Sequence, residues 1–239
     1  MTGTQPHLAL PQARGNAGSA RSEAAYAHLK HRLLEGDLTA GNKISVVEVT
    51  RALDCSRVPV MEALKRLESE GFIRIVPQVG CRVVTPVPAD VRDFFSLFAA
   101  VEGTVTRLAA ERRDAREVAD FESTCDSIDA ALADAAPPGE PDPTYRRLNL
   151  LFHSHIHRMA RSPVTTAIAS SLWDRSDFYI KLAFGSLYFS RRVREAHAAI
   201  RRAIAAGDGT GAGTAIASQL EFVGEAVAAA LERQAGLSN

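Results

Sequence analysis

The stretch from Ser56 to Gly71 limits the possible folds most strongly, because both of its ends carry helix signals. Ser56 suits an N-cap, Pro59 lies in the first turn, and Gly71 suits the left-handed residue that follows a helix. One face of this stretch has apolar residues at helical spacing: Val60, Ala63, Leu64 and Leu67. The sequence therefore predicts a short helix with one buried side.

The opposite face of this helix is basic and carries Arg57, Lys65 and Arg66. A helix that buries one side and offers basic groups on the other fits the major groove of DNA. The same pattern also describes an ordinary amphipathic surface helix. The neighbouring segments have to decide between these two interpretations.

Two shorter helices are predicted before it. Residues 23–35 place Tyr26, Leu29, Leu33 and Leu34 on one helical face, and Gly36 ends that helix. Residues 45–48 match a capping box, with serine at the N-cap and glutamate three residues later, and this box opens a helix to about residue 53. The spacing of the three helices is that of a helix-turn-helix.

Residues 72–84 predict two strands that form a hairpin, with Gly80 as a turn residue. Such a hairpin after a helix-turn-helix is the wing of a winged helix. Gln78 and Arg82 near the turn are candidates to reach a phosphate or the minor groove. The alternative is a plain hairpin that covers the core.

The strand signal ends at a stiff, proline-rich linker, residues 85–88. Helices are then predicted over residues 90–113, 115–135, 144–160, 163–184, 190–206 and 212–233. The first of them has an expected apolar side of Phe94, Leu97, Phe98, Val101, Val105 and Leu108. Glycine- and proline-rich loops are expected at 136–143 and 207–213. The predicted fold is mostly α, with an N-terminal winged helix-turn-helix (α+β) joined to a C-terminal all-α antiparallel helical bundle.

Composition limits where the protein works. The 239 residues include 28 basic and 28 acidic side chains, so any affinity for nucleic acid depends on their local placement. No apolar run approaches the length of a membrane span, and the three cysteines show no metal-binding spacing. Residues 1–22 contain no acidic residue and predict a disordered, weakly basic tail. We expect a soluble cytoplasmic protein with no membrane association.

The motif Ser56-Arg57-Val-Pro59-Val-x-Glu62-Ala63-Leu64-x-x-Leu67-x-x-Glu70-Gly71, followed by Gly80, resembles the winged helix of GntR-type bacterial transcription regulators. Residues 90–233 resemble the FCD effector domain of the FadR-like branch. The markers are Leu148-Asn149-x-x-Phe152-His153, Glu195-Ala-His197 and Ala205-Ala-Gly207-Asp208.

This resemblance implies a homodimer that binds a palindromic operator in double-stranded DNA, often as a repressor, and that is not an enzyme. It also implies a small-molecule effector, often an organic acid, bound in the helical domain. The expected domains are a tail at 1–22, a winged helix-turn-helix at 23–86, and an effector-binding and dimerisation domain at 90–235.

Two departures from the family concern DNA. Members usually have an arginine where this chain has Met61, and a basic residue is common near Val47. Arg57 therefore carries more of the expected specificity, since arginine is the commonest reader of guanine. The full set of candidate DNA-binding residues is Ser56, Arg57, Lys65, Arg66, Gln78, Gly80 and Arg82.

A metal site is implied by the family, as an aspartate, a histidine four residues later, and two further histidines. The matching residues here are Asn149, His153, His197 and Gln219. One expectation is a degenerate site for a divalent ion of the Zn, Ni or Mn type, and His157 adds a second i, i+4 pair with His153. The other is a polar pocket that hydrogen-bonds its effector directly.

Members also carry an arginine four residues before a glutamate, where it can clamp a carboxylate. The glutamate is Glu102, but the arginine position is Phe98, so Arg175 and Tyr179 are substitute candidates. The effector-binding candidates are Phe98, Glu102, Asn149, His153, Arg175, Tyr179 and His197. Core packing is the alternative for each. We expect an effector that is bulkier or less acidic than a small hydroxy acid.

Two other functions remain open from the sequence. A metal-dependent enzyme could use the histidine-rich helix, but no carboxylate joins His153 and His197 as a general base. A protein-interaction module is the other possibility, because the net charge is zero.

Overall fold

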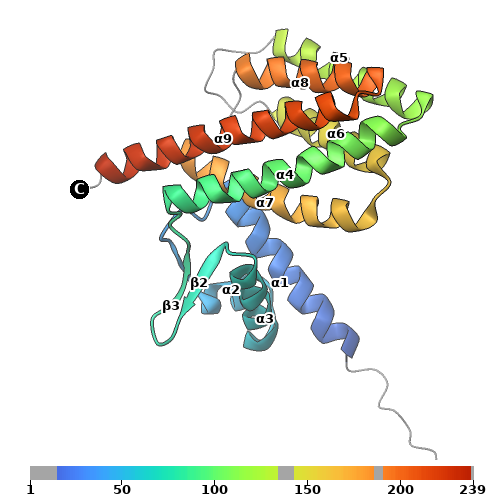
Figure 1. The fold of residues 1–239 in the computed structure, drawn as a ribbon. Coiled ribbons are helices and arrows are strands. Elements are labelled where there is room, and N and C mark those ends of the chain that lie inside the picture. The colour runs from blue at the N-terminus through green and yellow to red at the C-terminus, as the bar shows by residue number, and fades with distance from the viewer. Residues whose placement is uncertain (1–14, 134–142, 186–190, 238–239) are drawn as a thin grey trace, which may run out of the picture. The chain divides into compact units, whose positions relative to one another are not determined.

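The computed structural model describes residues 15–133, 143–185 and 191–237 (Figure 1). The chain divides into two compact units, unit 1 up to Val84 and unit 2 from Thr85 onward. Each unit has its own buried core, and each is described separately below.

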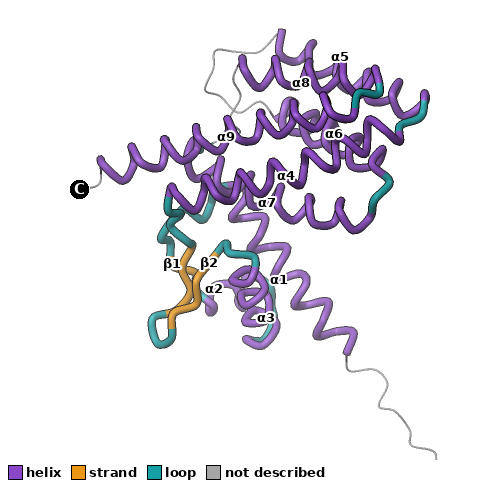
Figure 2. Tube along the Cα trace, in the orientation of Figure 1, coloured by secondary structure: helices purple, strands orange, loops and turns teal. Residues whose placement is uncertain are grey.

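Unit 1 contains three helices and a small sheet, in the order α1 (Gly15–Glu35), β1 (Lys43–Ile44), α2 (Val46–Ala52), α3 (Arg57–Ser69), β2 (Ile73–Val76) and β3 (Gly80–Val83). The sheet is antiparallel, with strand order β1-β3-β2 (Figure 2). This is a helix-turn-helix followed by a wing, as predicted. The sequence pattern carries no signal for β1, because two residues are too few to show alternation.

The core of unit 1 lies between α1, α3 and the sheet. Its buried apolar side chains include Leu29, Leu33, Val60, Leu64, Leu67, Phe72, Ile73, Cys81 and Val83. Complete burial of one such aliphatic side chain contributes about 1.5–3 kcal/mol. The predicted apolar stripe of α3 therefore fixes which side of this helix faces solvent.

Three residues in unit 1 were predicted to mark the ends of helices, and the structure shows how each of them is placed. The Glu48 amide donates to Ser45 Oγ (3.3 Å), as the capping box predicts. Gly71 has a φ of 76°, the left-handed conformation predicted for it. Ser56 stands at the N-cap of α3, as predicted, but its side chain makes no capping hydrogen bond.

Helix α1 begins eight residues before the predicted boundary of the domain, at Gly15. Residues 15–22 are therefore helical and do not belong to a disordered tail. All eight of these residues are Gly, Asn, Ala, Ser or Arg, which give no apolar period from which a helix could be predicted. The remainder of the predicted tail, residues 1–14, lies outside the described residues.

Unit 2 consists of six helices, within the described residues: α4 (Pro88–Arg112), α5 (Ala115–Ala133), α6 (Pro143–Ala160), α7 (Pro163–Phe184), α8 (Arg191–Ala206) and α9 (Gly209–Leu237). The sequence predicts all six, so the mostly helical fold class is confirmed. Helices α4 and α9 form the most extensive helix pair and run side by side in Figure 1.

The close crossing of α4 and α9 explains why α9 begins earlier than the sequence predicts. A Cβ atom on Gly213 would lie 2.7 Å from the Gly103 carbonyl oxygen, and one on Gly103 would lie 3.3 Å from the Gly213 oxygen. The predicted loop 207–213 is therefore helical from Gly209 onward. Its glycines allow two backbones to approach each other, and only Gly207 has a positive φ there.

The buried face of α4 also differs from the predicted one. Leu97 is 59% exposed, whereas Phe95 and Glu102 are fully buried beside the correctly predicted Phe98. Helix α4 packs against α6, α7, α8 and α9, so its buried side is broader than one apolar stripe.

Among the described helices, α9 is long and apolar enough to cross a membrane, by length and composition alone. Half of its most apolar window is buried in unit 2.

Candidate nucleic-acid interface and effector cavity

The first turn of α3 presents Arg57 and Val58 to solvent, and Lys65 is exposed two turns further on. Val58 is 65% exposed. Arginine can read a guanine edge, and an apolar side chain can contact a thymine methyl group. The beginning of α3 therefore offers both kinds of base contact, and Ser56 is exposed immediately before it.

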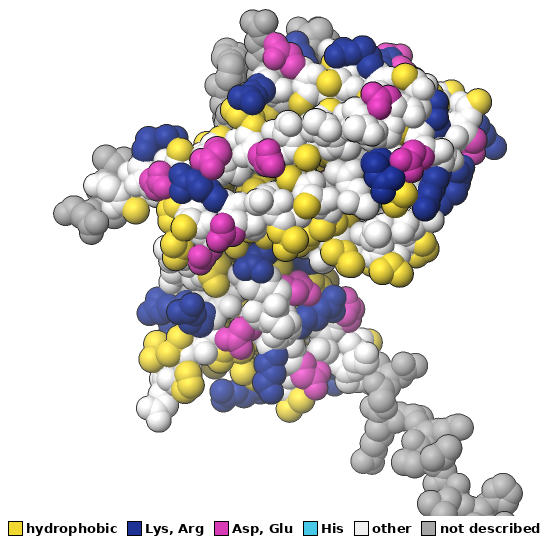
Figure 3. Space-filling model, viewed as in Figure 1, with side chains coloured by type: hydrophobic (Ala, Val, Ile, Leu, Met, Phe, Trp, Pro, Cys, Tyr) yellow, Lys and Arg dark blue, Asp and Glu magenta, His cyan; other side chains and the backbone are white. Residues whose placement is uncertain are grey.

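A row of basic side chains crosses the sheet of unit 1. Arg82 on β3 is opposite Lys43 on β1 and opposite Arg74 on β2, and all three residues are exposed. Basic side chains gather over these strands in Figure 3. Like charges directly opposite each other destabilise a sheet, so this arrangement favours an anionic partner such as a phosphate. We call these three residues the basic row.

Sequence reasoning selected Arg82 from the basic row but missed Lys43 and Arg74. The alternation of Arg74 with buried neighbours was available as a signal, whereas Lys43 requires the unexpected strand β1. Arg82 Nη1 also donates to the Gly41 carbonyl oxygen (3.0 Å), which fixes its direction.

The turn between β2 and β3 contains the other wing candidates. Gln78 is exposed and has a φ of 63°, and Gly80 has a φ of 113°. Positive φ at Gly80 is what the sequence led us to expect of a turn residue. For a glutamine it is uncommon, and no signal in the sequence indicated it.

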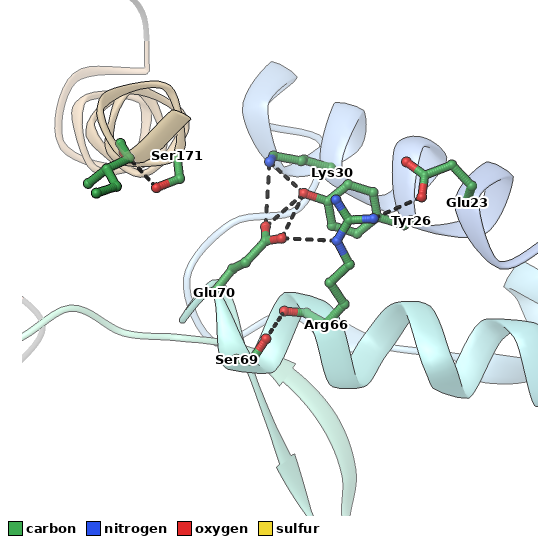
Figure 4. A network of polar contacts seen from close by, with 8 residues as sticks. Glu23, Tyr26, Lys30, Arg66, Ser69, Glu70 and Ser171 are labelled. Atoms are coloured by element: carbon green, nitrogen blue, oxygen red, sulfur yellow. Dashed lines mark hydrogen bonds and ion pairs between the residues drawn. The ribbon is translucent and has the colours of Figure 1, made fainter. Parts of the chain in front are cut away.

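Arg66 is placed differently from the other candidates. Its guanidinium lies 2.8 Å from Glu23, 3.2 Å from Glu70 and 3.5 Å from the centre of the Tyr26 ring (Figure 4). Lys30 donates to the Tyr26 hydroxyl (2.6 Å), and that hydroxyl donates to Glu70 (2.8 Å). Arg66 thus joins α3 to α1, whereas its DNA-binding role remains a prediction.

Unit 2 contains a small, partly open cavity between α6, α7, α8 and α9. Its lining residues are Asn149, His153, Trp173, Ser176, Asp177, Ile180, Val193, Gln219, Leu220 and Val223. The cavity volume of about 30 Å³ is enough for roughly one water molecule. Three of the four residues predicted for the metal or polar site line this cavity, and the fourth, His197, contacts it through Gln219.

Both histidines are buried, and burial disfavours their charged forms. Burial lowers the pKa of His153 well below its ordinary value, with smaller contributions from His197 and His157. Burial alone lowers the pKa of His197 to about 4. At neutral pH both imidazoles are therefore uncharged. The Gln219 amide nitrogen donates to His197 Nε2 (3.2 Å).

Several polar atoms around the cavity lack a hydrogen-bond partner within the described part of the chain. They are both ring nitrogens of His153, the hydroxyl of Ser176 and Oε1 of Gln219. A buried polar group without a partner costs about 1–3 kcal/mol. Atoms of this kind indicate a place where a water or a ligand is bound.

These residues do not fit a zinc-type metal site. Two neutral imidazoles and two amides supply no negative charge, and the Gln219 amide already occupies His197 Nε2. Among the described residues, no group of three or more His, Cys, Asp or Glu side chains is placed to hold an ion. His157 lies 2.8 Å from Glu102 instead of pairing with His153.

Glu102 holds the side chain of Trp173, which lines the cavity. It is fully buried, and its Oε1 accepts a hydrogen bond from Trp173 Nε1 (2.7 Å) as well as contacting His157. The Trp173 ring in turn packs against His153, with 4.0 Å between the ring centres. Glu102 is therefore a residue that positions the cavity wall and does not line the cavity.

The remaining effector candidates lie outside the cavity. Phe98 packs on Trp173, with 5.0 Å between ring centres. Arg175 Nε donates to the Tyr179 hydroxyl (3.0 Å), and both side chains pack near Phe94. The structure does not bring these three candidates together with His153.

Sequence reasoning missed Ser176 and Asp177 as lining residues. They follow Trp173 by three and four residues on α7 and precede Ile180 by four and three. That spacing was available as a signal, because such positions share one helix face.

Two family models match this chain. Residues 21–83 match the model described as bacterial regulatory proteins, gntR family, and residues 93–222 match the FCD domain. The second match covers more than half of the chain. The chain belongs to the GntR family with an FCD domain. This family consists of transcription regulators and not of enzymes, so an enzyme on the histidine-rich helix is not supported.

Curated relatives of this GntR-family chain are also described as regulators. An uncharacterized HTH-type transcriptional regulator from the TAR-I ttuE-ttuC' intergenic region of Agrobacterium vitis is 32% identical over 94 residues, 39% of this chain and 55% of that protein. The regulator BphR of Paraburkholderia xenovorans is 25% identical over 78% of this chain and 76% of its own length. The chain spans about half the length of the first curated relatives it matches.

Solved structures share the fold. Escherichia coli McbR/YncC superposes with a TM-score of 0.67 at 20% identity, over 90% of this chain and 98% of that one. A GntR regulator from Rhodococcus sp. RHA1 gives a TM-score of 0.66 at 20% identity, over 87% and 97%.

Proposed function

We propose that this protein is a sequence-specific DNA-binding transcription regulator whose operator affinity is controlled by a small molecule bound in unit 2. The observation that carries the proposal is the exposed beginning of α3, with Arg57 and Val58, in the same unit as the basic row. One surface element can read bases while the other contacts phosphates. The match to a family of bacterial regulatory proteins supports a role in transcription regulation.

We further propose a homodimer on a palindromic operator, because a two-fold dimer presents two copies of α3 to two half-sites. Repression in the bacterial cytoplasm, at the nucleoid, is the expected mode of action. The effector acts by favouring one arrangement of the dimer over another.

Arg57→Ala tests the reading helix. An operator is first selected from random duplexes with the wild-type protein, and binding is then measured by fluorescence anisotropy at two salt concentrations. Loss of a bidentate arginine–guanine contact costs about 1–3 kcal/mol, so we expect operator affinity to fall about 5- to 150-fold while binding to unrelated DNA changes much less.

The control is Arg202→Ala, which removes an exposed arginine from α8 in unit 2 and should leave both affinities unchanged. If Arg57→Ala keeps the operator affinity and sequence preference of the wild type, α3 is not the reading helix. If the wild-type protein selects no duplex at all, the proposed function is wrong, and a protein-interaction role becomes the better explanation.

A further inference from the structure

The cavity of unit 2 offers hydrogen-bond acceptors. Gln219 Oε1 can only accept, a neutral His153 ring has one accepting and one donating nitrogen, and the Ser176 hydroxyl can accept or donate. His153 is 96% buried, and neither of its nitrogens has a partner among the described residues. A ligand that donates a hydrogen bond would satisfy Gln219 Oε1 and the accepting nitrogen of His153, and a ligand group that also accepts, such as a hydroxyl, would satisfy the other ring nitrogen.

The charge around the cavity is unfavourable for an anion. The described lining residues include no lysine or arginine, and the one carboxylate among them is that of Asp177. A buried anion without a compensating positive charge carries a large desolvation cost.

The other walls of the cavity are apolar. Trp173, Ile180, Val193, Leu220 and Val223 surround the polar atoms. A ligand with an apolar body and one or two polar ends therefore matches the cavity better than a compact polar acid does.

We infer that this cavity binds, without a metal ion, an uncharged or cationic molecule that donates hydrogen bonds, such as an alcohol or an amine with an apolar body. The inference rests on the proposed function and names the class of effector for the same site. A cavity of about 30 Å³ has to widen to admit such a molecule, so binding selects an expanded arrangement of unit 2.

Two probe series test the ligand class at equal carbon number: benzyl alcohol, benzylamine and benzoate, and butanol, butylamine and butyrate. Binding to the full chain is measured by calorimetry and thermal shift at pH 7.5. We expect the alcohol or the amine to bind at least about tenfold more tightly than the acid in each series. Acids that bind as tightly as their partners, or absence of binding by all six compounds, would overturn the inference.

Ser176→Ala tests the location of binding. Removal of this buried hydroxyl should weaken binding of the tightest alcohol about fivefold, in line with the loss of one hydrogen bond. The matched control is Ser170→Ala on the same helix, where the serine is exposed and binding should be unchanged. Equal effects of the two substitutions would place the ligand elsewhere.

Metal independence is tested with Zn²⁺ and Ni²⁺ alone. The wild-type protein should show no metal binding that His153→Ala removes. The double variant Asn149→Asp with Gln219→His supplies a carboxylate and a third imidazole and should gain such binding, with a raised melting temperature. One tight equivalent of metal on the wild type that is lost in His153→Ala would contradict the inference.

Operator binding separates this inference from the proposed function. If the alcohols and amines bind as expected but no DNA sequence is selected, the proposed function fails and the ligand class stands. If an operator is bound but the acids bind best, the ligand class fails and the proposed function stands.

Discussion

The candidate DNA surface of unit 1 consists of charged side chains in solvent, whereas unit 2 buries four uncharged polar side chains at and beside its cavity, namely His153, Ser176, His197 and Gln219. Arg57, Lys65 and the basic row are exposed. Every buried side-chain atom that lacks a partner within the described residues belongs to unit 2. A phosphate backbone attracts charges that remain hydrated, while a small ligand gains most from groups already withdrawn from water.

This difference predicts that unit 2 is the more sensitive to loss of a single polar group. Glu102→Ala leaves His157 and Trp173 without their buried acceptor, so we expect unfolding to become easier by about 3–4 kcal/mol. Urea unfolding measures the change. The control Glu111→Ala removes an exposed glutamate of the same helix, paired with Arg107, and should cost less than about 1 kcal/mol. Similar losses for both would remove the contrast between buried and exposed polar groups.

Acid should also affect unit 2 through His197. Its pKa is about 4 in the folded protein and about 6.5 when unfolded, so the unfolded state binds the proton first as pH falls. Its stabilising contribution is complete above about pH 6.5 and decreases toward pH 4, by about 3 kcal/mol in total.

Urea unfolding at pH 7 and pH 4.5 of wild type and His197→Asn measures this contribution. Carboxylates titrate in both proteins, so the smaller pH dependence of the variant isolates the histidine. The control His31→Asn alters an exposed residue and should follow the wild type. A variant that loses as much stability in acid as the wild type would show that His197 is not held neutral by burial.

The smallest expected effects concern unit 1 and separate two kinds of basic residue. Arg66→Ala should cost about 1 kcal/mol of stability, through its ion pairs and its contact with the Tyr26 ring, and should leave the salt dependence of DNA binding unchanged. Replacing all three residues of the basic row by alanine should change the stability little and should reduce the salt dependence of DNA binding.

For that triple variant the slope of log K against log salt should fall by up to about 2.7, from about 0.9 for each phosphate contact. Anisotropy titrations over a salt series provide the slope. If Arg66→Ala changes the slope as much as the triple variant does, Arg66 also contacts phosphate.

Sequence reasoning predicted best where local signals and burial agree. The α3 stripe, the Ser45 cap and Gly71 all follow from spacing and residue type within one element. The six helices of unit 2 follow from periodicity and from loops rich in proline and glycine. These features depend on neighbours in the chain, which a sequence shows directly.

Sequence reasoning could not show what a distant element decides. β1 exists only because β3 pairs with it, and α9 starts early only because Gly213 meets the backbone of α4. Arg66 has the same spacing as a DNA-facing residue, yet Glu23 and Glu70 hold it. Phe98, Arg175 and Tyr179 have chemistry suited to an effector, but helix packing places them away from the cavity.

The contacts of Arg66 have a mechanical consequence. Because its guanidinium is held by Glu23 on one helix and Glu70 on its own, α3 cannot rotate about its axis without breaking ion pairs to α1. Helix α1 therefore holds α3 in place, and α3 keeps a fixed orientation within unit 1. In the homodimer that we propose, a regulatory signal would then move each winged helix-turn-helix as a whole and change the distance between the two copies of α3, not the orientation of α3 within either unit 1.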